Sequence, residues 1–142
     1  MSPLTTTTII DEKIPSRLNL VSGFIAAVVR KLENLKLAEE VVFDLKLCLH
    51  EALVNAVKHG NKHHEHLTVH VLIKADHHQL LMEVTDQGEG FDAAAIPNPT
   101  ADENIMASHG RGIHLIKSMM DKVTFLNDGR TVRMLKVFKG GS

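Results

Sequence analysis

Tryptophan and tyrosine are absent from this chain of 142 residues, and only five phenylalanines supply large aromatic rings. Proteins that bind single-stranded nucleic acid stack bases on such rings, so their scarcity argues against that class. Neither sign of charge dominates, because the formal net charge at pH 7 is −1. A chain this close to neutral has no bulk attraction for nucleic acid or an anionic membrane, and we expect neither as a direct partner.

Cysteine and long apolar runs are equally scarce. Cys48 is the single cysteine, which rules out an intrachain disulfide. No apolar run reaches the length of a membrane span, and the first residues lack the basic-then-apolar layout of a signal peptide. The sequence therefore predicts a cytoplasmic protein that folds as a single domain over residues 1–142.

The stretch 45–61 organises the rest of the chain. It reads LKLCLHEALVNAVKHGN, and its apolar residues recur at the spacing of an amphipathic helix. Glu51 and Asn55 are four residues apart, so they stack on a polar stripe that Lys58 and His59 extend. A carboxylate and a carboxamide on a half-buried helix need polar partners. The pair fits a bound cation, a water or a polar ligand. On spacing alone it fits better the polar edge of a core helix whose hydrogen bonds are satisfied.

Further elements follow from periodicity and turn chemistry. Helices come early, and the strands are mostly joined as hairpins. This order predicts an α+β fold, a two-layer sandwich with helices on one face of a mixed, mainly antiparallel sheet. We expect strands near 5–10 and at 67–74, 80–85, 122–127 and 131–138, helices at 17–35, 45–61 and 113–120, Ser16 as an N-cap, Gly60 as a C-cap and an Asp-Gly turn at 127–130.

Two glycine motifs interrupt this pattern. The first, DQGEGF at 86–91, contains Gly88 and Gly90, which allow close approach of the backbone to another group, although a simple turn fits equally well. The second, GRG at 110–112, enters a predicted helix as a dinucleotide fingerprint does. Leu115 stands where the third glycine would be and no strand precedes the motif, so a Rossmann fold is excluded.

Taken in order, E-x-x-x-N, D-x-G-x-G and G-x-G resemble the nucleotide-binding domain of the GHKL ATPase superfamily, which includes histidine kinases, gyrase-type topoisomerases and Hsp90 chaperones. The resemblance covers essentially the whole chain. It is strongest to the stand-alone anti-sigma-factor serine kinases of bacterial partner switching, through EALVNAVKHG at 51–60 and GRGIHLIKSMMDKV at 110–123. It implies a Bergerat-type ATP-binding fold, with ATP and Mg²⁺ as ligands and a mobile ATP lid at about 92–109.

The resemblance also implies roles for individual residues. Glu51 would be the general base, and Asn55 would hold Mg²⁺ through the ATP phosphates. Asp86 would recognise adenine, with Gly88 and Gly90 allowing the backbone to approach the base and ribose. The remaining nucleotide-binding positions that it implies are Lys58, His59, Phe91, Gly110, Arg111, Gly112, Ile113 and Thr131.

The implied function is that of an ATP-dependent anti-sigma-factor serine/threonine kinase. It would sequester a sigma factor, phosphorylate an anti-anti-sigma (STAS-type) antagonist and form a homodimer. One alternative is an ATP-binding switch module with little kinase activity that binds another regulator. Another is a domain detached from a histidine kinase that acts on a phosphotransfer protein. Histidines at 63–66 and 77–78 fit a metal site or solvated turns, and the second fits better because no helical His pair or cysteine accompanies them.

Overall fold

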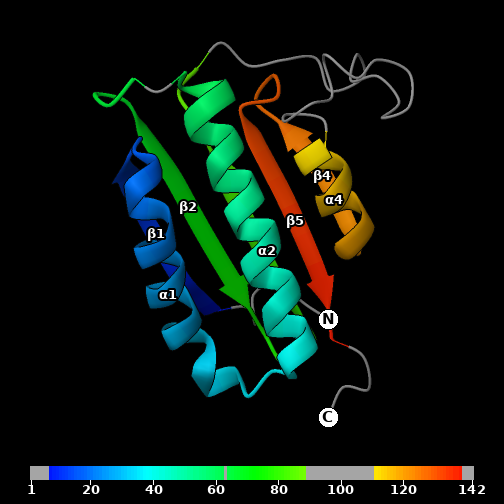
Figure 1. Cartoon of the computed structure of the whole chain (residues 1–142). Helices are drawn as coiled ribbons and strands as arrows, with labels where there is room; N and C mark the ends of the chain where they lie inside the picture. Colours follow the sequence, from blue (N-terminus) through cyan, green and yellow to red (C-terminus); the bar gives the residue numbers. More distant parts are fainter. Residues whose placement is uncertain (1–6, 63, 89–110, 139–142) are drawn as a thin grey trace.

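The computed structural model describes residues 7–62, 64–88 and 111–138. Figure 1 shows these residues as two layers, a sheet with helices packed on one of its faces. The sheet has five strands in the order β1-β2-β3-β5-β4, and every pairing among them is antiparallel, which confirms the predicted α+β class. The elements are β1 (Thr7–Pro15), α1 (Val21–Leu32), α2 (Glu39–Asn55), β2 (Thr68–Ala75), β3 (Gln79–Thr85), α4 (Arg111–Met119), β4 (Lys122–Leu126) and β5 (Thr131–Val137), with short 3₁₀ turns at Leu18–Leu20 and Glu33–Leu35 and a π-helical turn at Ala56–Gly60.

The core lies between the sheet and α2. Buried and partly exposed residues alternate strictly along β2 and β3, as a strand with one covered face requires. The central helical segment carries the predicted apolar stripe. Every residue of this stripe is buried: Leu45, Leu49, Ala52, Leu53 and Ala56. Within the described ranges, no helix is both long enough and apolar enough to cross a membrane.

The first strand runs further than predicted. β1 continues to Pro15, which pairs with Thr68 at the edge of the sheet, where a residue without an N–H is tolerated. Ser16 therefore does not cap a helix. It is 1% exposed, its N–H bonds to Leu67 O, and its hydroxyl accepts a hydrogen bond from Asn61. Pairing with β2 outweighs the local capping preference, and α1 begins only at Val21.

The end of the central helix also differs from the prediction. α2 starts at Glu39 and stops at Asn55, and the chain then widens into a π-helical turn, a feature that is frequent at functional sites. Gly60 is not a left-handed C-cap, because its own φ is not positive and Asn61 after it is also right-handed, at φ −83°. A Cβ on Gly60 would overlap the Asp86 carboxyl group. Glycine is needed there for close packing.

The β4–β5 connection is the Asp-Gly turn that the sequence predicted. Asn127, Asp128 and Gly129 all have positive φ, at 52°, 57° and 86°. Asn, Asp and Gly tolerate this conformation best, and it matches the twist of the strands that the turn joins. The turn places Arg130 and Thr131 at the end of the sheet where β3 also ends.

Candidate functional site

A pocket of about 250 Å³ opens where the C-terminal end of α2 meets the start of α4 and the ends of β3 and β5. Its volume lies just below the roughly 300–1,000 Å³ of pockets for drug-sized ligands, so it suits a flat heterocycle better than a whole nucleotide. One wall is apolar, formed by Val84, Ile113, Ile116, Phe125 and Val132. Its polar groups are Asn55, His59, Asp86 and Arg130.

The E-x-x-x-N motif of α2 and the G-x-G motif at the start of α4 meet at Gly112. This buried glycine is the second residue of α4, and α4 packs against α2. A Cβ on Gly112 would lie 2.9 Å from Glu51 Oε1 and 3.1 Å from Asn55 Nδ2. A larger residue here would push the ends of these two side chains aside, so glycine lets the helix begin close to the pair as it stands. The first N–H groups of α4 and the positive end of its dipole therefore lie beside Glu51 and Asn55, an arrangement that favours an anion.

The D-x-G-x-G motif, which follows β3, forms the side of the site that the sheet contributes. β3 ends at Thr85, and the Asp86 N–H donates to Arg130 O at 2.9 Å. Asp86 Oδ1 accepts the Gly88 N–H at 2.8 Å, which fixes the carboxyl group against its own turn. A Cβ on Gly88 would overlap the Gly60 carbonyl, so the two glycines let this turn pack on the end of the π-helical segment.

Asp86 has an altered ionisation. Its pKa is raised by burial, which opposes the charge, although the Gly88 N–H and the nearby Arg130 guanidinium pull the pKa down. A deprotonated Asp86 offers only hydrogen-bond acceptors to the pocket. The group therefore suits a ligand with an N–H donor, such as an exocyclic amine on a heterocyclic ring.

Glu51 does not line the pocket itself; it lies on α2 one helical turn before Asn55, which does. Its side chain is 28% exposed, and Oε2 lies 3.4 Å from His50 Nδ1. Oε1 faces the Gly112 backbone. The carboxylate thus combines access from solvent with a place at the start of α4, where it could take a proton from a group that approaches an anion bound there.

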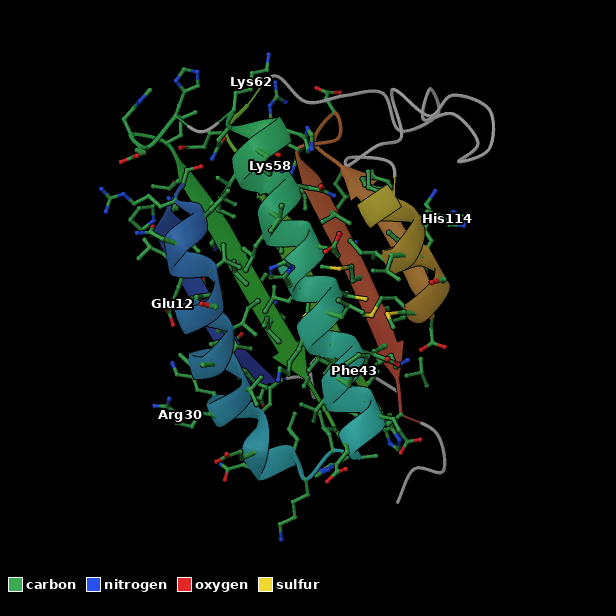
Figure 2. The ribbon with its side chains drawn as sticks, in the orientation of Figure 1. Glu12, Arg30, Phe43, Lys58, Lys62 and His114 are labelled. Carbon is green, nitrogen blue, oxygen red and sulfur yellow. The ribbon has the colours of Figure 1, made fainter. Side chains whose placement is uncertain are left out.

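The other predicted positions divide into four groups. His59 and Ile113 line the pocket. Lys58 is exposed and does not line it, and Figure 2 shows Lys58 near the end of the helical segment where the pocket opens. Thr131 is 2% exposed and lies beside the pocket, with its Oγ1 2.7 Å from Thr85 Oγ1 and accepting from Asn127 Nδ2. Outside the described residues lie Gly90, Phe91, Gly110, the predicted lid at 92–109 and the side chain of Arg111.

Asn61, which no sequence motif pointed to, is a buried amide that holds three segments together. Asn61 is 1% exposed, and its Oδ1 accepts the Gln87 N–H at 2.8 Å. Its Nδ2 donates to Ser16 Oγ at 3.2 Å and to Thr68 O at 3.0 Å. The signal in the sequence was a polar residue directly after the last turn of an apolar helix, but nothing local indicates its partners.

Replacing Asn61 by alanine should destabilise the fold by about 1–3 kcal/mol. The change leaves the partly buried Gln87 N–H and Thr68 carbonyl without the side chain that pairs with them. Thermal unfolding followed by circular dichroism measures the loss. Asn34→Ala is a suitable comparison, because Asn34 is an exposed amide in the Glu33–Leu35 turn without a positive φ. Equal stability of the Asn61 variant and the wild type would contradict the assigned role.

The histidine-rich turns do not form a metal centre in the described part of the chain. There, no group of three or more His, Cys, Asp or Glu side chains is placed to hold an ion. His64 and His66 are exposed, with their rings edge to face at 5.5 Å, and His77 and His78 are exposed in the β2–β3 turn. His63 is outside the described residues.

Comparison with known proteins agrees with the geometry. The family described as "Histidine kinase-like ATPase domain" matches residues 14–136, from the end of β1 almost to the end of β5. The serine-protein kinase RsbW of Staphylococcus epidermidis is 35% identical over 104 residues, which are 68% of this chain and 65% of that protein. RsbW of Staphylococcus aureus strain JH9 is 31% identical over 104 residues, again 68% of this chain and 65% of that protein. The chain thus spans slightly less than two thirds of the length of these curated relatives.

Proposed function

Because this chain belongs to the histidine kinase-like ATPase domain family, we propose that it binds ATP with Mg²⁺ and transfers the γ-phosphate to a serine or threonine of a protein. The observation that carries the proposal is the meeting of three motifs at one pocket. Gly112 brings the start of α4 against Glu51 and Asn55, and Gly60 and Gly88 bring Asp86 to the same end of the sheet. Relatives named serine-protein kinase support the choice of reaction.

In this proposal the pocket binds the adenine base. Asp86 Oδ1 is engaged by the Gly88 N–H, so Oδ2 is the oxygen left to accept from the exocyclic amine of the base. The apolar wall that includes Val84, Ile113 and Phe125 covers the faces of the ring. The volume of about 250 Å³ fits this assignment, because the ribose and phosphates would extend toward the start of α4.

Asn55 and the first turn of α4 form the proposed phosphate end of the site. The Gly112 backbone leaves room that a Cβ would fill, and the N–H groups at the helix start suit phosphate oxygens. Asn55 offers a neutral oxygen of the kind that Mg²⁺ accepts alongside phosphates and waters. The described residues contain no all-protein metal cluster, which agrees with an ion held mainly by the nucleotide. When bound, Mg²⁺ would neutralise phosphate charge during transfer.

Glu51 is the proposed general base. The hydroxyl oxygen of the acceptor attacks the γ-phosphorus, its proton passes to Glu51, and the bond to the β-phosphate oxygen breaks to release ADP. The 28% exposure of Glu51 lets an acceptor side chain reach it from outside. Its position beside the Gly112 backbone puts it next to the proposed phosphate end, as the reaction requires.

The partners are proposed from the resemblance of the sequence to the kinases of bacterial partner switching. We infer a STAS-type anti-anti-sigma protein as the acceptor and a sigma factor as the sequestered partner, with a cytoplasmic homodimer as the working form. The serine-protein kinases that match this chain support a protein acceptor with a serine.

Phosphotransfer with labelled ATP and Mg²⁺, run beside ATP-binding calorimetry, tests the proposal. The acceptor is a small STAS-type protein of the kind encoded near such kinases, offered with an excess of unrelated protein as a control. Label on a serine or threonine of that acceptor is the expected result. ATP binding without transfer to it would favour the switch module over the kinase, and absence of ATP binding would overturn both.

A further inference from the structure

Arg130 is a charged residue of the pocket that no sequence motif identified. It follows the tight β4–β5 turn and precedes β5, and it lines the same pocket as Asp86. Its side chain is 36% exposed, so most of that side chain is covered by protein. A half-buried arginine must donate to acceptors around it, and those acceptors reveal what it holds in place.

The guanidinium joins two turns that are far apart in the sequence. Arg130 Nε donates to Gly88 O at 2.7 Å, on the turn that carries Asp86. Its Nη1 donates to Asn127 O at 3.1 Å and lies 3.6 Å from Asp128 Oδ2, both on the β4–β5 turn. The Asp128 side chain is 91% exposed, so that ion pair adds little and the bond to Gly88 is the informative one.

The main chain of Arg130 completes the link. Its carbonyl accepts the Asp86 N–H at 2.9 Å, so the backbone and the side chain of one residue hold both ends of the Asp86–Gly88 turn. On the opposite side, Asn61 Oδ1 holds the Gln87 N–H. The turn is clamped from two directions, but only Arg130 brings a permanent charge to it.

We propose that Arg130 is the positioning residue of the base-binding site, fixing the Asp86–Gly88 turn and with it the Asp86 carboxylate in the place from which it can accept from the base. The inference rests on the proposed nucleotide function. It adds a requirement that this function does not contain, namely a cation on the β4–β5 turn. Arg130 acts through Asp86 and does not itself react.

Two substitutions separate the roles of charge and geometry. In Arg130→Gln both the charge and the guanidinium bond to Gly88 are lost, and we expect ATP to bind about 10-fold more weakly or worse. In Arg130→Lys the charge stays but the planar fork is lost, so we expect a smaller loss. Arg133→Gln is the matched control. Arg133 lies on the same strand with 44% side-chain exposure and pairs with Glu83 at 2.6 Å, away from the pocket, so ATP affinity should not change.

The pH dependence of ATP affinity gives a readout that simple loss of packing would not move. The Arg130 charge lowers the pKa of Asp86 against the opposing effect of burial. Without that charge the Asp86 pKa rises, so in Arg130→Gln the loss of affinity on acidification should begin at a higher pH. Arg130→Lys should keep the wild-type profile. Asp86→Asn should remove the acid limb that Asp86 causes.

His59 must be controlled because it is a second titratable side chain in the pocket. Among the described residues, His59 and Arg130 are the titratable or charged side chains that line the pocket with Asp86. Measuring Arg130→Gln again in a His59→Gln background assigns the shift in the profile to Asp86. A shift that disappears in this background would overturn the proposal.

The outcomes distinguish this inference from the function on which it rests. If the wild type fails to bind ATP, the proposed function is wrong. If the wild type binds ATP and Arg130→Gln binds it equally well with an unchanged pH profile, the function stands and the positioning role is wrong. Thermal unfolding of each variant shows that the compared proteins are folded at the temperature of the binding experiment.

Discussion

Replacing Glu51 by glutamine is expected to slow phosphotransfer about 100- to 10,000-fold, the usual contribution of a general base. Glutamine has the same shape but cannot take the proton of the attacking hydroxyl. The contacts that place ATP should survive, because Gly112 still meets a side chain of the same size. ATP affinity should therefore stay within a few-fold of wild type. Initial rates of label transfer and calorimetry on the same preparation measure the two effects separately.

Glu40→Gln is the control for this experiment. Glu40 lies in the first turn of the same helix, exposed and far from the pocket around Asn55 and Asp86. Its replacement removes one carboxylate from α2 without touching the site, so transfer should continue at the wild-type rate. Full activity of Glu51→Gln would remove Glu51 as the base, and equal loss in both variants would point to an effect on the helix.

The second large effect is expected from Asp86→Asn, which should weaken ATP binding about 10- to 100-fold. Asp86 Oδ1 already accepts the Gly88 N–H, so the amide oxygen of asparagine would keep that bond and turn its NH₂ toward the base. A donor would then face the donor amine of adenine. A lost charge-assisted hydrogen bond is worth about 1.5–3 kcal/mol, which corresponds to this range. Calorimetric titration with ATP and Mg²⁺ measures the loss.

Asp76→Asn is the matched control for Asp86. Asp76 is also an aspartate at the end of a strand, and it accepts N–H groups of its own turn, from His78 and Gln79. It lies in the β2–β3 turn and does not line the pocket, so its replacement should leave ATP affinity unchanged. Wild-type affinity in Asp86→Asn would contradict the assignment of Asp86 to the base.

The altered ionisation of Asp86 predicts that ATP affinity depends on pH differently in the wild type and in Asp86→Asn. Burial raises the Asp86 pKa in the folded state, so the carboxylate becomes protonated at a higher pH than an unfolded aspartate does. Protonation stabilises the folded state relative to the charged form, because it removes a buried charge. It also removes an acceptor for the base, so wild-type ATP affinity should fall as the pH drops through the raised pKa. The asparagine variant should not show this acid limb.

Local patterns in the sequence determined the layers of the fold. The apolar stripe from Leu45 to Ala56 is buried as predicted, and alternation along β2 and β3 places one face of each strand on the core. The positive φ of Asp128 and Gly129 matches the turn chemistry. These features depend on neighbours a few residues away, which the sequence displays directly.

The ordered motifs also identified the family and singled out residues that the structure brings together. The family match over residues 14–136 confirms the resemblance to the histidine kinase-like ATPases. Glu51, Asn55 and Gly112 lie together, and Asp86 joins Asn55 in the pocket. The proposed roles of these residues in ATP binding and transfer stay predictions that the experiments above test.

Only the tertiary structure decided what holds the site together. Ser16 looked like a helix cap and Gly60 like a helix end, yet Ser16 bonds to Asn61 and Gly60 makes room for Asp86. The Asn61–Gln87 bond spans 26 residues and the Arg130–Gly88 bond spans 42. Strand order and the distance between two backbones determine such partners. Neither produces a periodic pattern in the sequence. Sequence periodicity therefore predicted the layers, whereas the long-range hydrogen bonds around the pocket form only when the layers pack together.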